Sequence, residues 1–242
     1  MKIYRHLLSY FRINYFKTNK MIIPVVTWII FLISYYSNIG QTWIESVVFS
    51  SIFLFVISAW IAYVYMDGIN IIDEQLLMLK VKNFNVYYNS KIIFVYLIGF
   101  CLGLMGIVLP IMLNYIRKFA LFGEIIDIKS IFGALIFYFI ISILAGTLGM
   151  FFQPRYFKNR KISVTLTVLI TIMTIVKSSI IRKYKLSKYI LWILPPFSNI
   201  IQCFDSKHIF NFLGLGIALC YSFIYSFIML MVSRYLLKKT LF

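Results

Sequence analysis

Long uncharged apolar stretches alternate with short, mostly basic segments along the whole chain. Stretches without Asp, Glu, Lys or Arg cover residues 21–44, 46–66, 92–116, 130–154 and 208–233. A helix needs about 20 residues to cross the hydrocarbon core of a bilayer, so each stretch is long enough. Residues 162–176 form a shorter stretch, which becomes a full span if Lys177 snorkels or faces the protein interior and the helix continues to Ile181. The pattern therefore predicts six transmembrane helices.

Composition supports the same class of protein. The 242 residues are 62% hydrophobic and 13% charged, whereas soluble domains are typically about 45–50% apolar and roughly 25% charged. One small core cannot bury this much apolar surface, so lipid must surround much of it. We expect an all-α membrane protein in which residues 1–242 form a single transmembrane domain.

The formal net charge of +17 raises the possibility of nucleic-acid binding. The basic residues lie at the ends of the apolar stretches, however, and this pattern is typical of membrane topology and of contacts with anionic lipid headgroups. With the N-terminus inside the cell, fifteen of the 24 Lys and Arg fall on the inner side, in residues 2–20, 80–91, 155–161 and 234–239. The positive-inside rule then predicts a multi-pass protein of the cell membrane with both termini in the cytoplasm and no nucleic-acid partner.

Three segments outside the spans have patterns of their own. In residues 1–20, Ile3, Leu7, Phe11 and Tyr15 recur every four positions, which predicts an interfacial amphipathic helix; a merely basic flank of the first span is the alternative. Residues 68–91 place a short mixed-charge amphipathic segment between the second and third spans. Residues 186–205 contain Pro195 and Pro196, which predict a broken, re-entrant or interfacial element on the extracellular side.

Motifs for catalysis are missing from the sequence. It contains no G-x-x-x-x-G-K-[ST], H-E-x-x-H, G-x-S-x-G or Cys-x-x-Cys. Its seven carboxylates all lie outside the predicted spans, which argues against an ion-driven carrier and an intramembrane metalloprotease. We therefore expect no catalytic residue, no metal site and no cofactor on this chain.

Hydroxyl side chains follow one face of the fifth predicted span. Ser163, Thr167, Thr171, Thr174 and Ser178 recur at helical spacing, with Lys177 to one flank. Two interpretations remain open: Thr167, Thr171, Thr174, Lys177 and Ser178 line a translocation pathway, or the hydroxyls serve helix packing.

The combination of these parts resembles the ABC-2-type permease family, the transmembrane subunits of ATP-driven exporters. The local match runs from Asp73-Glu74-Gln75-Leu76-Leu77 through Asn83-Phe84-Asn85-Val86-Tyr87-Tyr88 to Ser90-Lys91. The layout of six spans, an N-terminal elbow helix over residues 1–20 and a broken element between spans five and six is similar to that family as well. Lantibiotic-immunity permeases and the phenol-soluble modulin exporter are the relatives that the composition most resembles.

The resemblance implies a coupling helix over residues 73–89 that docks onto a separate ATPase subunit, which would carry the ATP and Mg. The coupling residues that it implies are Asp73, Glu74, Phe84, Tyr87, Tyr88 and Lys91. It also implies a second permease subunit, identical or homologous.

Uncharged spans favour an amphipathic or hydrophobic substrate. The resemblance implies an antimicrobial or cytolytic peptide as the leading candidate. A permease for lipids or hydrophobic drugs and a sensory or structural membrane subunit without transport are the alternatives.

Overall fold

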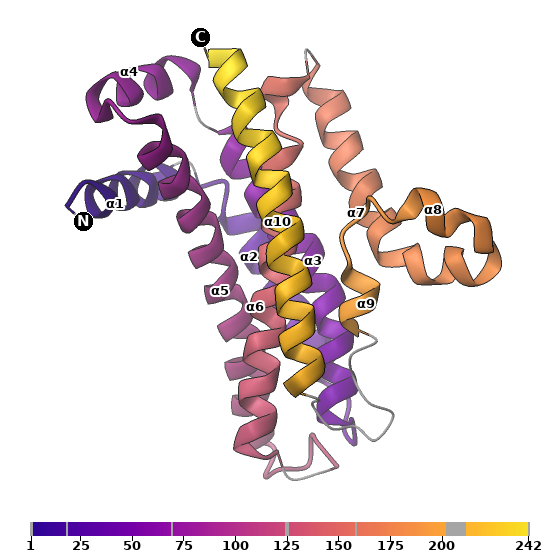
Figure 1. The fold of residues 1–242 in the computed structure, drawn as a ribbon. Helices are drawn as coiled ribbons and strands as arrows, with labels where there is room; N and C mark the ends of the chain where they lie inside the picture. Colours follow the sequence, from indigo (N-terminus) through magenta and orange to yellow (C-terminus); the bar gives the residue numbers. More distant parts are fainter. Residues whose placement is uncertain are drawn as a thin grey trace.

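The protein is an all-α membrane protein in the computed structural model, which describes residues 2–17, 19–68, 70–123, 126–157, 159–201 and 212–241. Five helices are long and apolar enough to cross a bilayer. They are α3 (Trp43–Asp67), α5 (Phe84–Ile116), α6 (Ile128–Phe151, followed by the 3-10 turn η1, Pro154–Tyr156), α7 (Arg160–Lys183) and α10 (Phe212–Leu241). They form an elongated bundle with α10 along one side (Figure 1).

The first predicted span is shorter than expected. Helix α2 covers only Ile22–Tyr35 of the predicted 21–44 window, which corresponds to about 21 Å of helix. Just beyond its end, the Arg117 guanidinium donates hydrogen bonds to the carbonyl oxygens of Tyr36 (3.1 Å) and Ser37 (2.6 Å). Among the described residues, five helices are thus candidate spans by length and composition, or six if α2 and the preceding α1 (Lys2–Lys17), which meet at an angle of 80°, count as one.

Helix α6 is the centre of the bundle and packs against α3, α5 and α10. At Gly149 a Cβ atom would collide with the backbone of Ala59 on α3, and at Gly99 it would come within 2.9 Å of Ser142 Cβ on α6. Glycine therefore allows these backbones to approach closely. By contrast, α7 and α10 bury only about a fifth of their most apolar windows.

The apolar stripe of α1 faces the protein. Leu7, Phe11 and Tyr15 are buried, whereas Ile3 is exposed. The Phe11 ring lies 6.2 Å from that of Tyr65 on α3, and the Tyr15 hydroxyl donates a hydrogen bond to the Ile61 carbonyl at 3.3 Å. The stripe thus holds α1 onto the bundle, and a different face of the helix is left for the membrane.

The segment after α7 leaves the bundle sideways (Figure 1). The end of α7, the 3-10 turn η2 (Lys185–Ser187) and α8 (Lys188–Leu191) build a side hairpin, residues 182–193. Pro195 and Pro196 separate it from α9 (Phe197–Ile201). Residues 202–205 of the predicted 186–205 element, and the first residues of the predicted 208–233 span, lie outside the described residues.

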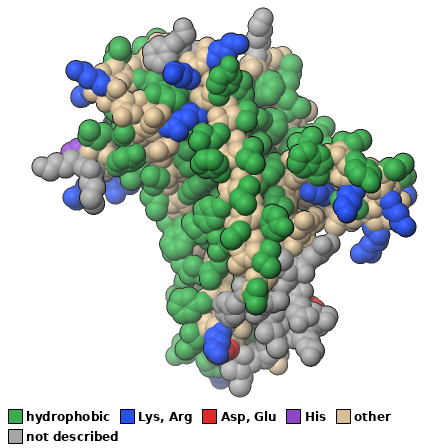
Figure 2. Space-filling model, in the orientation of Figure 1, with side chains coloured by type: hydrophobic (Ala, Val, Ile, Leu, Met, Phe, Trp, Pro, Cys, Tyr) green, Lys and Arg blue, Asp and Glu red, His purple; other side chains and the backbone are tan. Residues whose placement is uncertain are grey.

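The segments that the charge pattern assigns to one side lie at one end of the bundle. The C-terminus, the connection between α6 and α7 and the short helix α4 (Ile71–Val81) share that end (Figure 1). On the face shown in Figure 2, hydrophobic side chains cover the middle, and Lys and Arg gather towards that end and on the side hairpin. This distribution fits a bilayer around the middle of the bundle.

Candidate functional site

The polar segment between α3 and α5 folds as two helices that meet at a sharp corner. Asn70 caps α4 by accepting a hydrogen bond from the Ile72 N–H at 3.1 Å, and Asp73 and Glu74 occupy the first turn, where negative charge is favourable. Lys82 ends α4 in the left-handed conformation (φ 55°). Asn83 then caps α5 by accepting from the N–H groups of Asn85 and Val86.

The predicted coupling segment, residues 73–89, therefore lies on two helices, and its coupling role stays a prediction. Helix α4 ends at Val81, and Phe84 to Lys91 form the first turns of the long span α5. Lys82, the C-cap of α4, and Asn83, the N-cap of α5, interrupt the helical backbone hydrogen bonding between the two helices. Because α4 is a separate helix, its orientation relative to α5 depends on side-chain contacts between the two helices.

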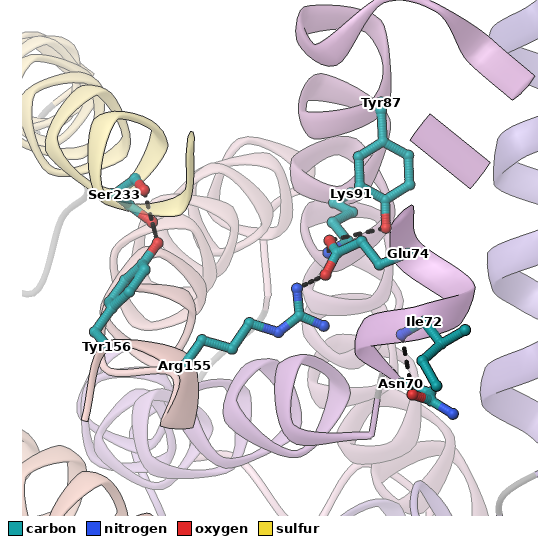
Figure 3. A network of polar contacts seen from close by, with 8 residues as sticks. All are labelled: Asn70, Ile72, Glu74, Tyr87, Lys91, Arg155, Tyr156 and Ser233. Atoms are coloured by element: carbon teal, nitrogen blue, oxygen red, sulfur yellow. Dashed lines mark hydrogen bonds and ion pairs between the residues drawn. The ribbon is translucent and has the colours of Figure 1, made fainter. Parts of the chain in front are cut away.

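Glu74 is such a side chain, since it is fully buried between three elements. Its carboxylate forms ion pairs with Lys91 of α5 and with Arg155 of η1. The Tyr87 hydroxyl donates a third contact to Glu74 Oε1 at 2.9 Å, and Lys91 Nζ also lies 4.9 Å from the centre of the Tyr87 ring. Figure 3 shows the carboxylate surrounded by these groups. We call Glu74, Tyr87, Lys91 and Arg155 the Glu74 cluster.

The surroundings extend the cluster to α10. Tyr156, next to Arg155, donates to the Ser233 carbonyl of α10 at 2.6 Å (Figure 3). The Tyr88 hydroxyl donates to the Leu230 carbonyl at 3.4 Å, and the Arg234 guanidinium lies 5.7 Å from the Tyr88 ring. The end of the bundle that carries α4 is thus tied together by polar contacts from four separate parts of the chain.

The structure buries four of the six residues predicted to couple to a partner, and their coupling role stays a prediction. Glu74, Tyr87, Tyr88 and Lys91 have no more than 1% of their surface exposed, so in this conformation their side chains cannot touch another subunit. Asp73 is exposed and Phe84 is partly buried. Of the six residues proposed for docking, these two lie where a partner could reach them.

An apolar stripe on the outside of α4 was missed by the sequence analysis. Ile72, Leu76 and Leu79 are 64%, 59% and 70% exposed. Their spacing of four and three residues places them on one face of the helix, opposite the buried Glu74. We call this stripe the outer face of α4. The i, i+4, i+7 spacing of these apolar residues can be read from the sequence. No sequence pattern near Arg155 indicates that it forms an ion pair with Glu74.

The hydroxyl stripe of α7 points inward but is satisfied locally. Thr167, Thr171, Thr174 and Lys177 are buried, and the three threonine hydroxyls donate to carbonyls one turn back in α7 at 2.7–2.9 Å. Lys177 Nζ donates to the Leu194 carbonyl at 3.2 Å. Lys177, rather than Ser178, completes the buried face, since Ser178 is exposed.

Part of that stripe borders an open groove. Thr167 and Thr171 lie with Trp60 and Tyr63 along a groove of about 510 Å³ between α3 and α7. The packing interpretation of the hydroxyls accounts for their hydrogen bonds. A pathway along this groove stays a prediction.

Comparison with known proteins returned no match to a family model, a curated protein or a solved structure.

Proposed function

We propose that this chain is the transmembrane permease subunit of an ATP-driven exporter of the ABC-2 type. The observation that carries the proposal is the construction of α4, which presents an apolar outer face to its surroundings and holds Glu74 inside the bundle. Ile72, Leu76 and Leu79 are the surface onto which an ATPase subunit would dock, with Asp73 and Lys80 at its edges. A helix that presents anchors at i, i+4 and i+7 suits binding in a hydrophobic groove of a partner.

The Glu74 cluster gives the movement of such a partner a route into the membrane. A rigid-body displacement of α4 pulls on Lys91, which lies in the first turns of α5, and on Arg155, which lies between α6 and α7. Buried ion pairs resist separation, since opening one leaves an uncompensated charge inside the protein. Closure of the ATPase subunits on ATP would therefore shift two spans together.

The substrate proposed for this subunit is an amphipathic or hydrophobic molecule, with a membrane-active peptide as the leading candidate. Apolar lining dominates the groove between α3 and α7, and such a surface suits the apolar side of a peptide more than an ion. A second permease subunit would complete the pathway, and the weakly buried α7 and α10 leave apolar faces for it.

Docking is tested by placing charge on the outer face of α4. The double variant Leu76→Asp/Leu79→Asp should abolish co-purification of a P-loop ATPase, identified by mass spectrometry, and the ATP hydrolysis that accompanies it. A matched control is Leu186→Asp/Ile190→Asp, which places the same charges on two exposed residues of the side hairpin. Equal ATPase recovery from the docking variant and the wild type would contradict the docking role.

Export itself needs a second readout. The purified complex in vesicles should hydrolyse ATP faster when a cationic amphipathic peptide is added than when a lipophilic dye is added. A response to the dye alone would favour a drug permease, and no bound ATPase at all would favour a subunit without transport.

A further inference from the structure

We propose that a cavity between α1, α2 and α5 binds one anionic phospholipid, with its phosphate on Arg5 and Arg12 and an acyl chain along α5. The cavity has a volume of about 950 Å³, which is at the upper end of the range for small-molecule sites, about 300–1,000 Å³. The inference does not depend on the proposed transport function.

One end of the cavity is cationic. Arg5, Ser9 and Arg12 lie on α1 at spacings of four and three residues and share one face of the helix. Both guanidinium groups belong to exposed residues, and no Asp or Glu is among the described residues that line the cavity. Arginine binds phosphate through paired, charge-assisted hydrogen bonds. Two arginines two turns apart therefore suit one negatively charged headgroup.

The rest of the cavity is apolar and has the length of one leaflet. Phe94, Leu97, Cys101 and Met105 form its wall on α5. From Phe94 to Met105 the helix rises about 16 Å, which is close to half of a hydrocarbon core that is about 30 Å thick. Leu97 and Met105 are exposed on this wall, so an acyl chain would cover surface that the protein leaves open.

The position of α1 points to the bilayer as the source of the phosphate. Helix α1 turns away from α2 by 80° and lies across the bundle near the end that carries α4 (Figure 1). A basic amphipathic helix in this orientation lies at headgroup depth. A free phosphate ion would use only the arginines and would gain nothing from the apolar wall, whereas a phospholipid uses both.

Lipid retention measures the proposal directly. The delipidated full-length chain is mixed with vesicles of equal parts phosphatidylcholine and phosphatidylglycerol, re-extracted in mild detergent and analysed by native mass spectrometry. The wild type should retain one phosphatidylglycerol. Arg5→Gln/Arg12→Gln should weaken retention at least about tenfold, since hydrogen bonds to charged groups contribute about 1.5–3 kcal/mol each. Lys185→Gln/Lys188→Gln removes the same charge from the side hairpin and should retain the lipid.

A second variant tests the apolar part with both arginines in place. Cys101→Trp fills the wall from a position that is exposed in the cavity and should also displace the lipid. Thermal unfolding without lipid shows whether each variant is folded. Equal retention of phosphatidylcholine, equal loss in the lysine control, full retention by Cys101→Trp, or the same stabilisation by inorganic phosphate as by phosphatidylglycerol would overturn the proposal.

Discussion

The α4–α5 corner and the last third of α7 each place a lysine inside the protein, but the two lysines have different hydrogen-bond partners. Lys91 meets a carboxylate from another helix, and that carboxylate also holds a third element. Lys177 meets a backbone carbonyl, and its threonine neighbours bond to their own helix. Opposite charges that pair between elements make those elements move together. A lysine on a neutral carbonyl and threonines bonded to their own helix mainly allow α7 to be buried.

The largest effect should come from removing the shared carboxylate. Glu74→Gln leaves Lys91 and Arg155 buried without their counter-charge, and we expect a loss of about 3–5 kcal/mol in the free energy of unfolding. Unfolding in mixed detergent and SDS micelles measures it. Asp73→Asn, the exposed neighbour on α4, is the matched control and should change stability by less than about 0.5 kcal/mol. Similar losses for the two variants would contradict a stabilising role for the ion pairs of Glu74.

The same substitution at the two lysines sharpens the comparison. Lys91→Met breaks a hydrogen bond between charged groups and should cost about 2 kcal/mol, less than Glu74→Gln because Arg155 still balances Glu74. Lys177→Met leaves one carbonyl unpaired and should cost about 1 kcal/mol. Unfolding in the same micelles measures both losses in the free energy of unfolding. A larger loss for Lys177→Met than for Lys91→Met would show that the ion pair of Lys91 is not the stronger contact.

The smallest effect should come from the hydroxyl stripe. Thr171→Val removes a hydroxyl that donates to the Thr167 carbonyl of the same helix. We expect a loss below about 0.6 kcal/mol, the average for hydrogen bonds between membrane helices, because this bond joins no second helix. Ser178→Val, on the exposed side of α7, serves as the control. A loss above about 2 kcal/mol at Thr171 would show that the stripe contacts more than its own helix.

Hydropathy alone was enough to predict an all-α membrane protein, because lipid exposure demands long apolar helices with satisfied backbones. The same pattern predicted a full span over 21–44, but α2 ends at Tyr35, and the carbonyls just beyond it accept hydrogen bonds from Arg117, far away in the sequence. Helical spacing predicts which polar residues of a span share a face only to within about one position. For that reason Ser178 was predicted on the buried face of α7, where the structure has Lys177.

The candidate site was harder to predict. Aromatic and charged residues near a membrane surface suggested docking, yet Tyr87, Tyr88 and Lys91 are buried. Tyr87 and Lys91 contact Glu74, and Tyr88 contacts α10; only the tertiary structure brings these groups together. The outer face of α4, in contrast, follows from spacing alone. The sequence thus predicted which residues of this segment are polar or apolar, but not which of them the fold buries; docking of a partner on this segment stays a prediction.

Hydrogen exchange of α4 tests most directly whether Glu74 holds this helix to the bundle. In the wild-type chain in micelles, the amides of residues 75–81 should exchange slowly as a group. In Glu74→Gln they should exchange faster, together with residues 155–157, while α3 and α6 keep their wild-type protection. Unchanged exchange in α4 and in residues 155–157 would contradict the account, since the helix would then be held by something other than its buried carboxylate.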